Sequence, residues 1–400
     1  MITEIEIGGF KSLEKVRLKL GKLNLFVGAN ASGKSNFLDA LRVFQGIGNG
    51  FSIEEIFQGK PKSATSEVWT GIRGSLGKAR FMRQASPGED EGPIVFRARL
   101  RAPRGVHEFS YAIGISPDRR LAIDFERLDV DARPVFSVDD QTTTLSGSYA
   151  LPDLGQKGRS ALPALTGLDF LMLLEGTENE ERKACVRLLS NMQRLAPVPE
   201  ILGDYSPSLF AHRIGESGEN FASLVKSILD SKADGLAYVS WLRELLGSEA
   251  EEIEILPGAK EDLLFALKRG KLVFPANILS DGTLRFAALV AAFFQPDMPD
   301  VITIEEIENG IHPSRLRLLV ELLKSQSSEN SPQVFATTHS PVVLAWLDES
   351  DYDTTFFCKR DEETGASIIK PLSEIPHLIE LVRKRSISDL YLQGWMEAAL

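Results

Sequence analysis

The segment that decides the fold is Gly28-Ala29-Asn30-Ala31-Ser32-Gly33-Lys34-Ser35, which matches the pattern G-x-x-x-x-G-K-[S/T] in full. In such a loop, backbone N–H groups turn inward around phosphate oxygens, and the lysine ammonium reaches the β- and γ-phosphates. The hydroxyl of Ser35 is the type of ligand that Mg²⁺ takes at the start of a helix. The segment therefore predicts a site for a nucleoside triphosphate with Mg²⁺, rather than an exposed glycine-rich turn.

The residues on each side of this loop fit a strand that leads through a loop into a helix. Leu23 to Val27 is a short apolar run, which predicts a buried strand. After the loop, apolar residues recur at helical spacing and predict a helix from Ala31 to Phe44. This order is the context that a phosphate-binding loop needs, and it makes a chance match to the pattern less credible.

Composition places the chain among ordinary globular proteins. Its 400 residues are 43% hydrophobic and 25% charged, which excludes wholesale disorder and a small disulfide-stapled fold. Cys185 and Cys358 match no paired-thiol metal spacing, so we expect both to be buried, small apolar residues. The net charge of -11 disfavours avid nonspecific binding to nucleic acid, although it leaves room for a local basic face.

Targeting and membrane signals are weak throughout. The N-terminal MITEIEIGGFKS alternates charged and apolar residues and lacks the layout of a signal peptide. The longest uncharged apolar run, Phe286 to Phe294, is half of a membrane span. We therefore expect a cytoplasmic protein without membrane association.

The remaining pattern predicts one α/β domain interrupted by an insertion. Two strands are expected in the first 27 residues, and residues 139–165 are expected to be loop-like. Antiparallel strands are predicted at residues 67–72, 94–101, 108–115 and 121–130. Helical stretches are predicted at residues 167–195 and 219–247, with further elements at 273, 284–294, 301–304, 313–323 and 334–337. We expect an N-terminal lobe at 1–138, a mainly helical insertion at 139–262 and a C-terminal lobe at 263–400.

A second group of candidate catalytic residues follows the strand predicted at Val301 to Ile304. Glu305 and Glu306 lie directly after the carboxyl end of this strand. Beside a phosphate loop, Glu305 is predicted to hold Mg²⁺ through water and Glu306 to polarise the attacking water. The first acid is usually Asp, so Glu305 is a departure from the usual pattern. Without the phosphate loop, the two glutamates would read as a solvated strand end.

Three further residues lie at the predicted start of a helix or the end of a strand, where a structural role competes with a functional one. Ser280, in Leu279 to Arg285, is a natural N-cap at a helix N-terminus that could bind an anion. His339 follows a predicted strand, at the edge where ligands bind in open α/β sheets. His312 precedes Pro313 and is interpreted as a cap or packing residue.

In this order, the segments GANASGKSN, LSDGTLR, ITIEEIENGIHP and ATTHSP resemble the ABC-type ATPase heads of the SMC, RecF and OLD group. They resemble most closely the bacterial stand-alone AAA-family ATPases of phage-defence and abortive-infection systems. The resemblance covers residues 1–60 and 270–345 well and the middle of the chain poorly. It implies a P-loop ATPase head with an antiparallel β subdomain, split by the insertion.

In that family, two heads sandwich two ATP molecules. The resemblance implies that Ser280, Asp281 and Gly282 contact nucleotide held by the other head. It implies that Glu306 is the catalytic base and that His339 contacts the γ-phosphate, while Glu308 to Gly310 cross the dimer seam. Nucleotide contacts within one head are implied for Gly28, Asn30, Ser32, Gly33, Lys34, Ser35 and Asn36, and metal contacts for Ser35 and Glu305.

Some correspondences stay open. Phe10-Lys11-Ser12 resembles a motif of SMC-like heads, with Gly9 in place of Asn, and it reads equally well as a strand-ending turn. The glutamine that links nucleotide and metal in the family could be Gln58 or Gln84. The C-terminal stretch around Trp395 resembles the tails of defence ATPases that are encoded beside a small effector, and packing of this tail onto the head is an equal alternative.

These observations favour an ATPase that forms a head-to-head homodimer, or a higher even oligomer, and controls a separate effector in anti-phage defence. The short, proline-broken insertion excludes the long coiled coil of SMC proteins. The 61 residues after His339 are too few for the Toprim domain of OLD nucleases. The alternatives are a RecF-like ATPase that binds DNA directly and a nucleotide-sensing scaffold with little hydrolysis.

Overall fold

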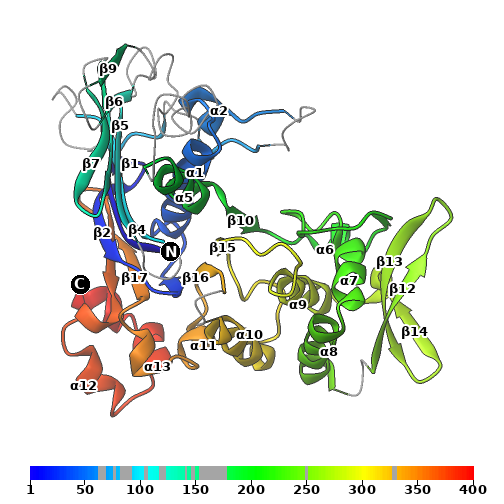
Figure 1. Ribbon diagram of the computed structural model, residues 1–400. Helices are drawn as coiled ribbons and strands as arrows, with labels where there is room; N and C mark the ends of the chain where they lie inside the picture. Colours follow the sequence, from blue (N-terminus) through cyan, green and yellow to red (C-terminus); the bar gives the residue numbers. More distant parts are fainter. Residues whose placement is uncertain are drawn as a thin grey trace. The chain divides into compact units, whose positions relative to one another are not determined.

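The computed structural model describes residues 1–61, 69–74, 78–81, 92–102, 107–116, 123–139, 142–145, 149–152, 178–247, 251–326 and 331–400. The chain forms two compact units (Figure 1). Unit 1 comprises residues 1–192, 352–378 and 399–400, and unit 2 comprises 193–351 and 379–398. The three-part division expected at residues 138 and 262 stays a prediction. Among the described residues, every helix is too short or too polar to cross a membrane.

An eight-stranded antiparallel sheet dominates unit 1, in the order β2-β1-β4-β5-β6-β7-β8-β9. Alternation of buried and exposed side chains along β4 and β5 gives this sheet one apolar face. Its strands are β1 (Ile2–Phe10), β2 (Leu13–Lys19), β4 (Ile94–Arg101), β5 (Glu108–Ile115), β6 (Ile123–Val130), β7 (Arg133–Asp139), β8 (Thr142–Leu145) and β9 (Tyr149–Pro152).

Unit 1 also contains the strand that leads into the phosphate loop. β3 (Leu23–Val27) pairs in parallel with β17 (Thr355–Arg360), which pairs antiparallel with β18 (Ser367–Pro371). The loop then enters α1 (Lys34–Gly48), whose side chains are buried over most of its surface. α1 also packs against α5 (Glu178–Ser190), and α2 (Ile53–Gln58) begins with a capping box at Ser52 and Glu55.

Aromatic rings fix α1 on both sides. On one side, Phe37 stacks on Phe26 of β3 with ring centroids 4.4 Å apart, and Phe26 lies 5.0 Å from Phe356 of β17. On the other side, Phe44 contacts the edge of Phe96 of β4 at 5.9 Å. Because these rings are almost completely buried, they join the strand, the helix and the antiparallel sheet in one core.

Unit 2 carries the second strand pair of interest, β15 (Val301–Ile304) and β16 (Gln333–Thr338), which run parallel. α9 (Asp281–Ala292) is apolar on nearly all sides and is buried accordingly. Tyr238 of α8 (Lys232–Leu246) donates a hydrogen bond to the carbonyl of Ala287 in α9 at 3.1 Å. The elements that follow are α10 (Pro313–Ser325) and α11 (Pro341–Leu344).

The rest of unit 2 consists of short helices and a small antiparallel sheet in which β13 pairs with β11, β12 and β14. These elements are α6 (Pro199–Leu202), β11 (Ser206–Pro207), α7 (Phe221–Asp230), α8 (Lys232–Leu246), β12 (Glu252–Pro257), β13 (Asp262–Arg269), β14 (Leu272–Pro275), α13 (Ile387–Leu392) and α14 (Trp395–Ala399). β10 (Met192–Leu195) and α12 (Leu378–Val382) lie where the chain passes between the units.

Several sequence predictions agree with these bounds, and others are wrong. The strands at residues 94–101, 108–115 and 301–304 are confirmed. The loop expected over 139–165 is wrong where β8 and β9 extend the sheet, because consecutive threonines at 142–144 suit a strand. The two strands expected in the first 27 residues are three, since residues 13–19 alternate between buried and charged side chains and form β2.

Helix predictions needed two corrections. The stretch 219–247 is two helices, because Ser231 ends α7 and accepts a hydrogen bond from the backbone N–H of Asp234 as the N-cap of α8. The stretch 167–195 contains α5 and then turns into β10, while residues 167–177 lie outside the described part. Of the stretch 67–72, residues 67–68 are not described, and Trp69 forms only an isolated bridge with Lys60.

Phe26→Ala should lower the free energy of unfolding by about 3–5 kcal/mol, because it removes a fully buried ring that contacts both α1 and β17. Urea unfolding followed by fluorescence measures the change. Phe51→Ala is the matched control, since Phe51 is only half-buried and should cost less. Equal losses in the two variants would contradict this description of the core.

Candidate functional site

The phosphate loop closes around the side chain of its own lysine. Lys34 Nζ donates hydrogen bonds to the carbonyl oxygens of Gly28, at 2.6 Å, and of Ala29, at 2.8 Å. The side chain is buried, so its positive charge is fixed inside the loop rather than exposed to solvent. An anion that enters the loop therefore meets a cation that is already in place.

Two glycines of the loop leave no room for a side chain. A Cβ at Gly28 would lie 2.1 Å from the carbonyl oxygen of Cys358. A Cβ at Gly33 would lie 2.0 Å from Ser367 Oγ, and Gly33 has a φ of 103°, which favours glycine. The loop can thus take this path only because both positions lack a Cβ.

Ser32, within the loop, and Cys358, which packs against it, differ in what they offer to a ligand. Ser32 Oγ is buried and has no hydrogen-bond partner among the described residues, so it remains available to a ligand that enters the loop. Cys358 lies beneath the loop, and burial raises the pKa of its thiol to about 12, although the Lys34 charge opposes this effect. Cys185 is also buried, and burial raises the pKa of its thiol, so the prediction that both cysteines are buried is confirmed.

A cavity of about 560 Å³ opens beside the start of α1 in unit 1. Five basic side chains and one acidic side chain contribute to its lining, which gives it a positive character. The lining residues are Lys11, Ser12, Ser35, Asn36, Asp39, Arg73, Lys78, Arg80, Phe81, Arg360, Thr364 and Gly365. Because Ser35 belongs to the phosphate loop, this cavity is continuous with the predicted phosphate site.

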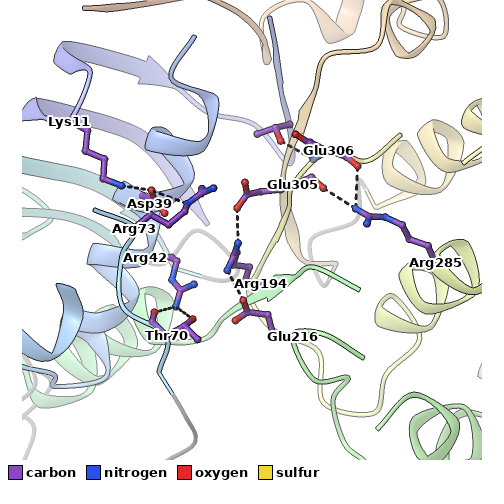
Figure 2. Close-up of polar contacts among 11 residues, drawn as sticks. Lys11, Asp39, Arg42, Thr70, Arg73, Arg194, Glu216, Arg285, Glu305 and Glu306 are labelled. Carbon is purple, nitrogen blue, oxygen red and sulfur yellow. Dashed lines mark hydrogen bonds and ion pairs between the residues drawn. The ribbon is translucent and has the colours of Figure 1, made fainter. Parts of the chain in front are cut away.

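The turn between β1 and β2 contacts α1 at this cavity. Figure 2 shows Lys11 directed to Asp39, with Nζ 2.5 Å from Oδ2, and Arg73 on the same carboxylate at 3.8 Å. Ser12 Oγ accepts a hydrogen bond from Asn36 Nδ2 at 2.7 Å. The Phe10-Lys11-Ser12 segment is therefore a strand-connecting turn that also lines the cavity.

In unit 2, Glu305 follows β15 and forms an ion pair with an arginine of β10. Arg194 donates to Glu305 Oε1 at 2.9 Å and to Glu216 Oε1 at 2.5 Å, so one guanidinium bridges two carboxylates (Figure 2). The Glu305 and Arg194 side chains are both mostly buried. This arrangement orients the carboxylate that the sequence predicts as a metal ligand.

Glu306 has an unusual backbone conformation, with a φ of 49°. Its N–H donates to Thr337 Oγ1 at 3.0 Å, at the end of the neighbouring strand β16. Arg285 Nη2 donates to the carbonyls of Glu305, at 3.2 Å, and of Glu306, at 3.3 Å (Figure 2). Burial lowers the pKa of Arg285, and the carboxylates of Glu306 and Glu308 partly offset this effect. Strand-end contacts thus hold Glu306 in a left-handed conformation that residues other than glycine seldom adopt.

The segment that contains Ser280 begins α9 as the sequence predicts. Ser280 is the N-cap, and its Oγ accepts a hydrogen bond from the backbone N–H of Thr283 at 3.3 Å. Ser280 and Asp281 are both exposed. Gly282 packs against the loop after β15, because a Cβ there would lie 2.2 Å from the carbonyl oxygen of Gly310.

His339 follows β16 and is held by Glu308. Its backbone N–H lies 2.7 Å from Glu308 Oε1, and its ring Nδ1 lies 3.0 Å from the same oxygen. His312 is the N-cap of α10, where its Nδ1 accepts a hydrogen bond from the N–H of Ser314 at 3.3 Å, so the interpretation as a capping residue is confirmed.

Unit 1 brings together Gly28, Ser32, Gly33, Lys34, Ser35 and Asn36, with Asn30 exposed in the same loop. Unit 2 brings Glu305, Glu306 and His339 to the ends of β15 and β16, and it places Ser280, Asp281 and Gly282 at the start of α9. Gln58 ends α2 and is exposed, outside the set that lines the cavity, whereas Gln84 lies outside the described residues.

Sequence reasoning missed the cations that orient the acids. Arg285 is the only charged residue of α9 after Asp281 at its start, and a charge before an apolar run was a usable signal. Arg194 had no such signal, because nothing in its local sequence indicates that it reaches Glu305. In the tail, Trp395 is half-buried, whereas Leu392 is 68% exposed.

Comparison with known proteins agrees with this geometry. Residues 1–64 match the family AAA_15, described as AAA ATPase domain. Residues 207–345 match the family AAA_21, described as AAA domain, putative AbiEii toxin, Type IV TA system. The first range contains the phosphate loop, and the second contains Ser280, Glu305, Glu306 and His339.

One curated relative is similar over a short stretch. It is an ATP/GTP phosphatase from Helicobacter pylori (strain ATCC 700392 / 26695), 34% identical over 98 residues. The match covers 22% of this chain and 26% of the relative, so it spans about a quarter of that protein's length.

Among solved structures, an SMC head bound to the C-winged helix domain of ScpA matches with a TM-score of 0.51 and 16% sequence identity. The match covers 93% of this chain and 98% of that one. At this identity the match establishes a shared fold alone. Residues 1–64 and 207–345 thus resemble AAA-family ATPase domains, and the chain shares the α/β fold of an SMC head.

Proposed function

We propose that this protein binds and hydrolyses ATP at sites shared between two copies of the chain, and that the resulting switch controls a separate effector. The observation that carries the proposal is the phosphate loop. The loop combines the buried Lys34 ammonium, two glycines without a side chain and the Ser32 hydroxyl, which has no hydrogen-bond partner in the described part of the chain. Together these groups form a cradle suited to phosphate. The adjoining basic cavity suits the rest of an anionic nucleotide.

The donor groups also fit Mg²⁺, which prefers oxygen ligands and usually keeps several waters. Ser35, which lines the cavity, has a hydroxyl oxygen, and Glu305 has a carboxylate at the end of β15. We assign these two residues to the ion, with Glu305 acting through water. When bound, Mg²⁺ neutralises negative charge on the β- and γ-phosphates.

In the proposed reaction, Glu306 orients and polarises the attacking water, and Lys34 neutralises charge on the transferred phosphoryl group. His339 contacts the γ-phosphate from the end of β16. The contacts that Thr337 and Arg285 make with the backbone at Glu306 support this role, because a water-positioning group must be held in one place.

The proposed contact with the second copy of the chain lies at the start of α9. Ser280 and Asp281 are exposed there, and Ile278, just before them, is 65% exposed although it is apolar. An exposed apolar residue beside polar helix-end groups suits a protein contact. We propose that this surface meets the nucleotide held by the phosphate loop of the other copy, in a two-fold symmetric dimer.

The output is proposed to be anti-phage defence in the cytoplasm. The AbiEii description of the family that matches residues 207–345 supports such a role. The solved SMC head binds a domain of another protein, ScpA, which supports the general idea that a head of this fold can act on a protein partner. We place the effector surface on residues 140–260 and on the tail around Trp395. Within that range, residues 140–141, 146–148, 153–177 and 248–250 lie outside the described part of the chain.

A complementation experiment tests the shared site. Lys34→Ala removes the phosphate-loop charge, and Ser280→Arg blocks the opposite surface, so each variant alone should be inactive. Mixed in equal amounts, half of the dimers should contain one intact composite site, which gives about a quarter of wild-type phosphate release.

Calorimetry provides the control, since Ser280→Arg should still bind ATP whereas Lys34→Ala should bind it weakly. A mixture that is as inactive as its components, with both proteins folded, would contradict the shared site. Full activity of Ser280→Arg alone would do the same.

Replacing Glu306 with Gly should separate stability from activity. Both Glu306→Gly and Glu306→Ala remove the carboxylate and should abolish hydrolysis. Because glycine accepts a φ of 49° without steric cost, the Gly variant should be about 1 kcal/mol more stable than the Ala variant. Urea unfolding and a phosphate-release assay measure the two effects, and a Gly variant no more stable than Ala would contradict a left-handed Glu306.

A further inference from the structure

Glu308 makes two contacts with one histidine. Its Oε1 lies 2.7 Å from the backbone N of His339 and 3.0 Å from the ring Nδ1. The Glu308 side chain is only 9% exposed, whereas the His339 side chain is 47% exposed. The nearly buried Glu308 carboxylate thus holds the half-exposed imidazole of His339 in place.

The chemistry of these groups fixes which ring nitrogen carries hydrogen. An ionised carboxylate can only accept hydrogen bonds, so Nδ1 must be the donor in this contact. A neutral imidazole then leaves Nε2 without a hydrogen. The second carboxylate oxygen, Oε2, is buried without a hydrogen-bond partner among the described residues, so Oε1 makes the contacts to His339, and the nearby Arg285 charge also favours the ionised carboxylate.

Hydrogen bonds to the backbone hold both Glu308 and His339 in place. The N–H of Ile307 donates to the carbonyl of Thr337 at 3.1 Å, which ties the Glu308 loop to the end of β16. On the other side, Tyr391 of α13 donates from its hydroxyl to the carbonyl of His339 at 3.4 Å. These contacts restrict both partners, so the Glu308 carboxylate and the imidazole meet in one arrangement.

We propose that Glu308 is a positioning residue that sets the orientation and tautomer of His339, so that Nε2 is the ring nitrogen presented to the nucleotide. To donate from Nε2 to a phosphate oxygen, the ring carries hydrogen on both nitrogens, and the Glu308 carboxylate at Nδ1 compensates the positive charge of that imidazolium. The inference rests on the proposed function, in which His339 contacts the γ-phosphate. It differs from the role that the family resemblance gives Glu308, which is to cross the dimer seam.

The pairing can be tested without ATP hydrolysis. The chain has five histidines, so ¹⁵N-histidine labelling gives a tractable spectrum, and His339→Asn identifies the signal of His339. In the wild type, long-range ¹H–¹⁵N spectra of neutral His339 should show the Nδ1–H tautomer. Glu308→Ala should shift it toward Nε2–H, and Glu308→Gln, whose amide oxygen still accepts, should retain Nδ1–H. A wild type with Nε2–H, or a Glu308→Ala spectrum unchanged from wild type, would overturn the proposal.

Kinetics then tests the consequence. Glu308→Ala should lower kcat about 10- to 100-fold with little change in ATP affinity, by analogy with partners that orient other catalytic imidazoles. Glu308→Gln should recover part of that loss. Because Glu308 acts through His339, adding Glu308→Ala to His339→Ala should cause no further loss.

The two proposals can fail separately. If His339→Ala lowers kcat but Glu308→Ala does not, Glu308 has no positioning role and the proposed function stands. If His339→Ala keeps full activity, the contact between His339 and nucleotide fails, and the positioning role fails with it, whatever the spectra show. Glu349→Gln is the matched control, because Glu349 is an exposed carboxylate of the same unit and should alter neither spectrum nor rate.

Discussion

A buried ammonium held by two main-chain carbonyls is the interaction on which the rest of unit 1 depends. Lys34 can occupy the interior of the loop only because Gly28 and Gly33 let the backbone pass Cys358 and Ser367. Those neighbours are in place because β3, β17 and β18 pair and because Phe26 packs between α1 and β17. A charge without solvent is costly unless it is hydrogen-bonded, so the loop is built to hold a cation and, with it, an anion.

Unit 2 also holds charged groups in place by hydrogen bonds, but there the fixed groups are carboxylates and not a lysine. Its acids stand at strand ends, and cations orient them: Arg194 pairs with the Glu305 carboxylate, and Arg285 holds the carbonyls of Glu305 and Glu306. The left-handed backbone of Glu306 is a local strain that these contacts offset. Phosphate chemistry needs fixed charges more than it needs reactive groups, and both units provide charges that are fixed by hydrogen bonds.

The sequence predicted the features that depend on local pattern. Periodicity and capping chemistry predicted three features that the structure contains. They are the strand at 301–304, the N-caps at Ser280 and His312, and the strand-loop-helix order around Lys34. β8 and β9 could not be predicted from composition, because Ser, Thr, Gly and Pro suit loops as well as edge hairpins. Ser231 followed by Asp234 is a capping pattern that indicates a new helix at Ser231. Helical periodicity on both sides of Ser231 instead led to the prediction of one continuous helix.

Contacts between distant segments were beyond such reasoning. Arg194 and Glu305 are 111 residues apart, and the pairing of Glu308 with His339 spans 31 residues. Neither pair leaves a trace in local sequence, since an arginine in a strand and a glutamate in a loop are ordinary. The basic cavity is similar, because Lys11, Arg73 and Arg360 come from three separate segments that only the fold brings together.

In the proposed mechanism, each nucleotide site requires two copies of the chain. The most direct measurement is the rate of phosphate release per protein molecule, at saturating ATP and Mg²⁺, over a wide range of protein concentration, with sedimentation velocity on the same samples. If two copies share each site, the specific rate should rise with protein concentration and reach a plateau where the ATP-bound dimer is complete. A constant specific rate from a protein that sediments as a monomer throughout would contradict it.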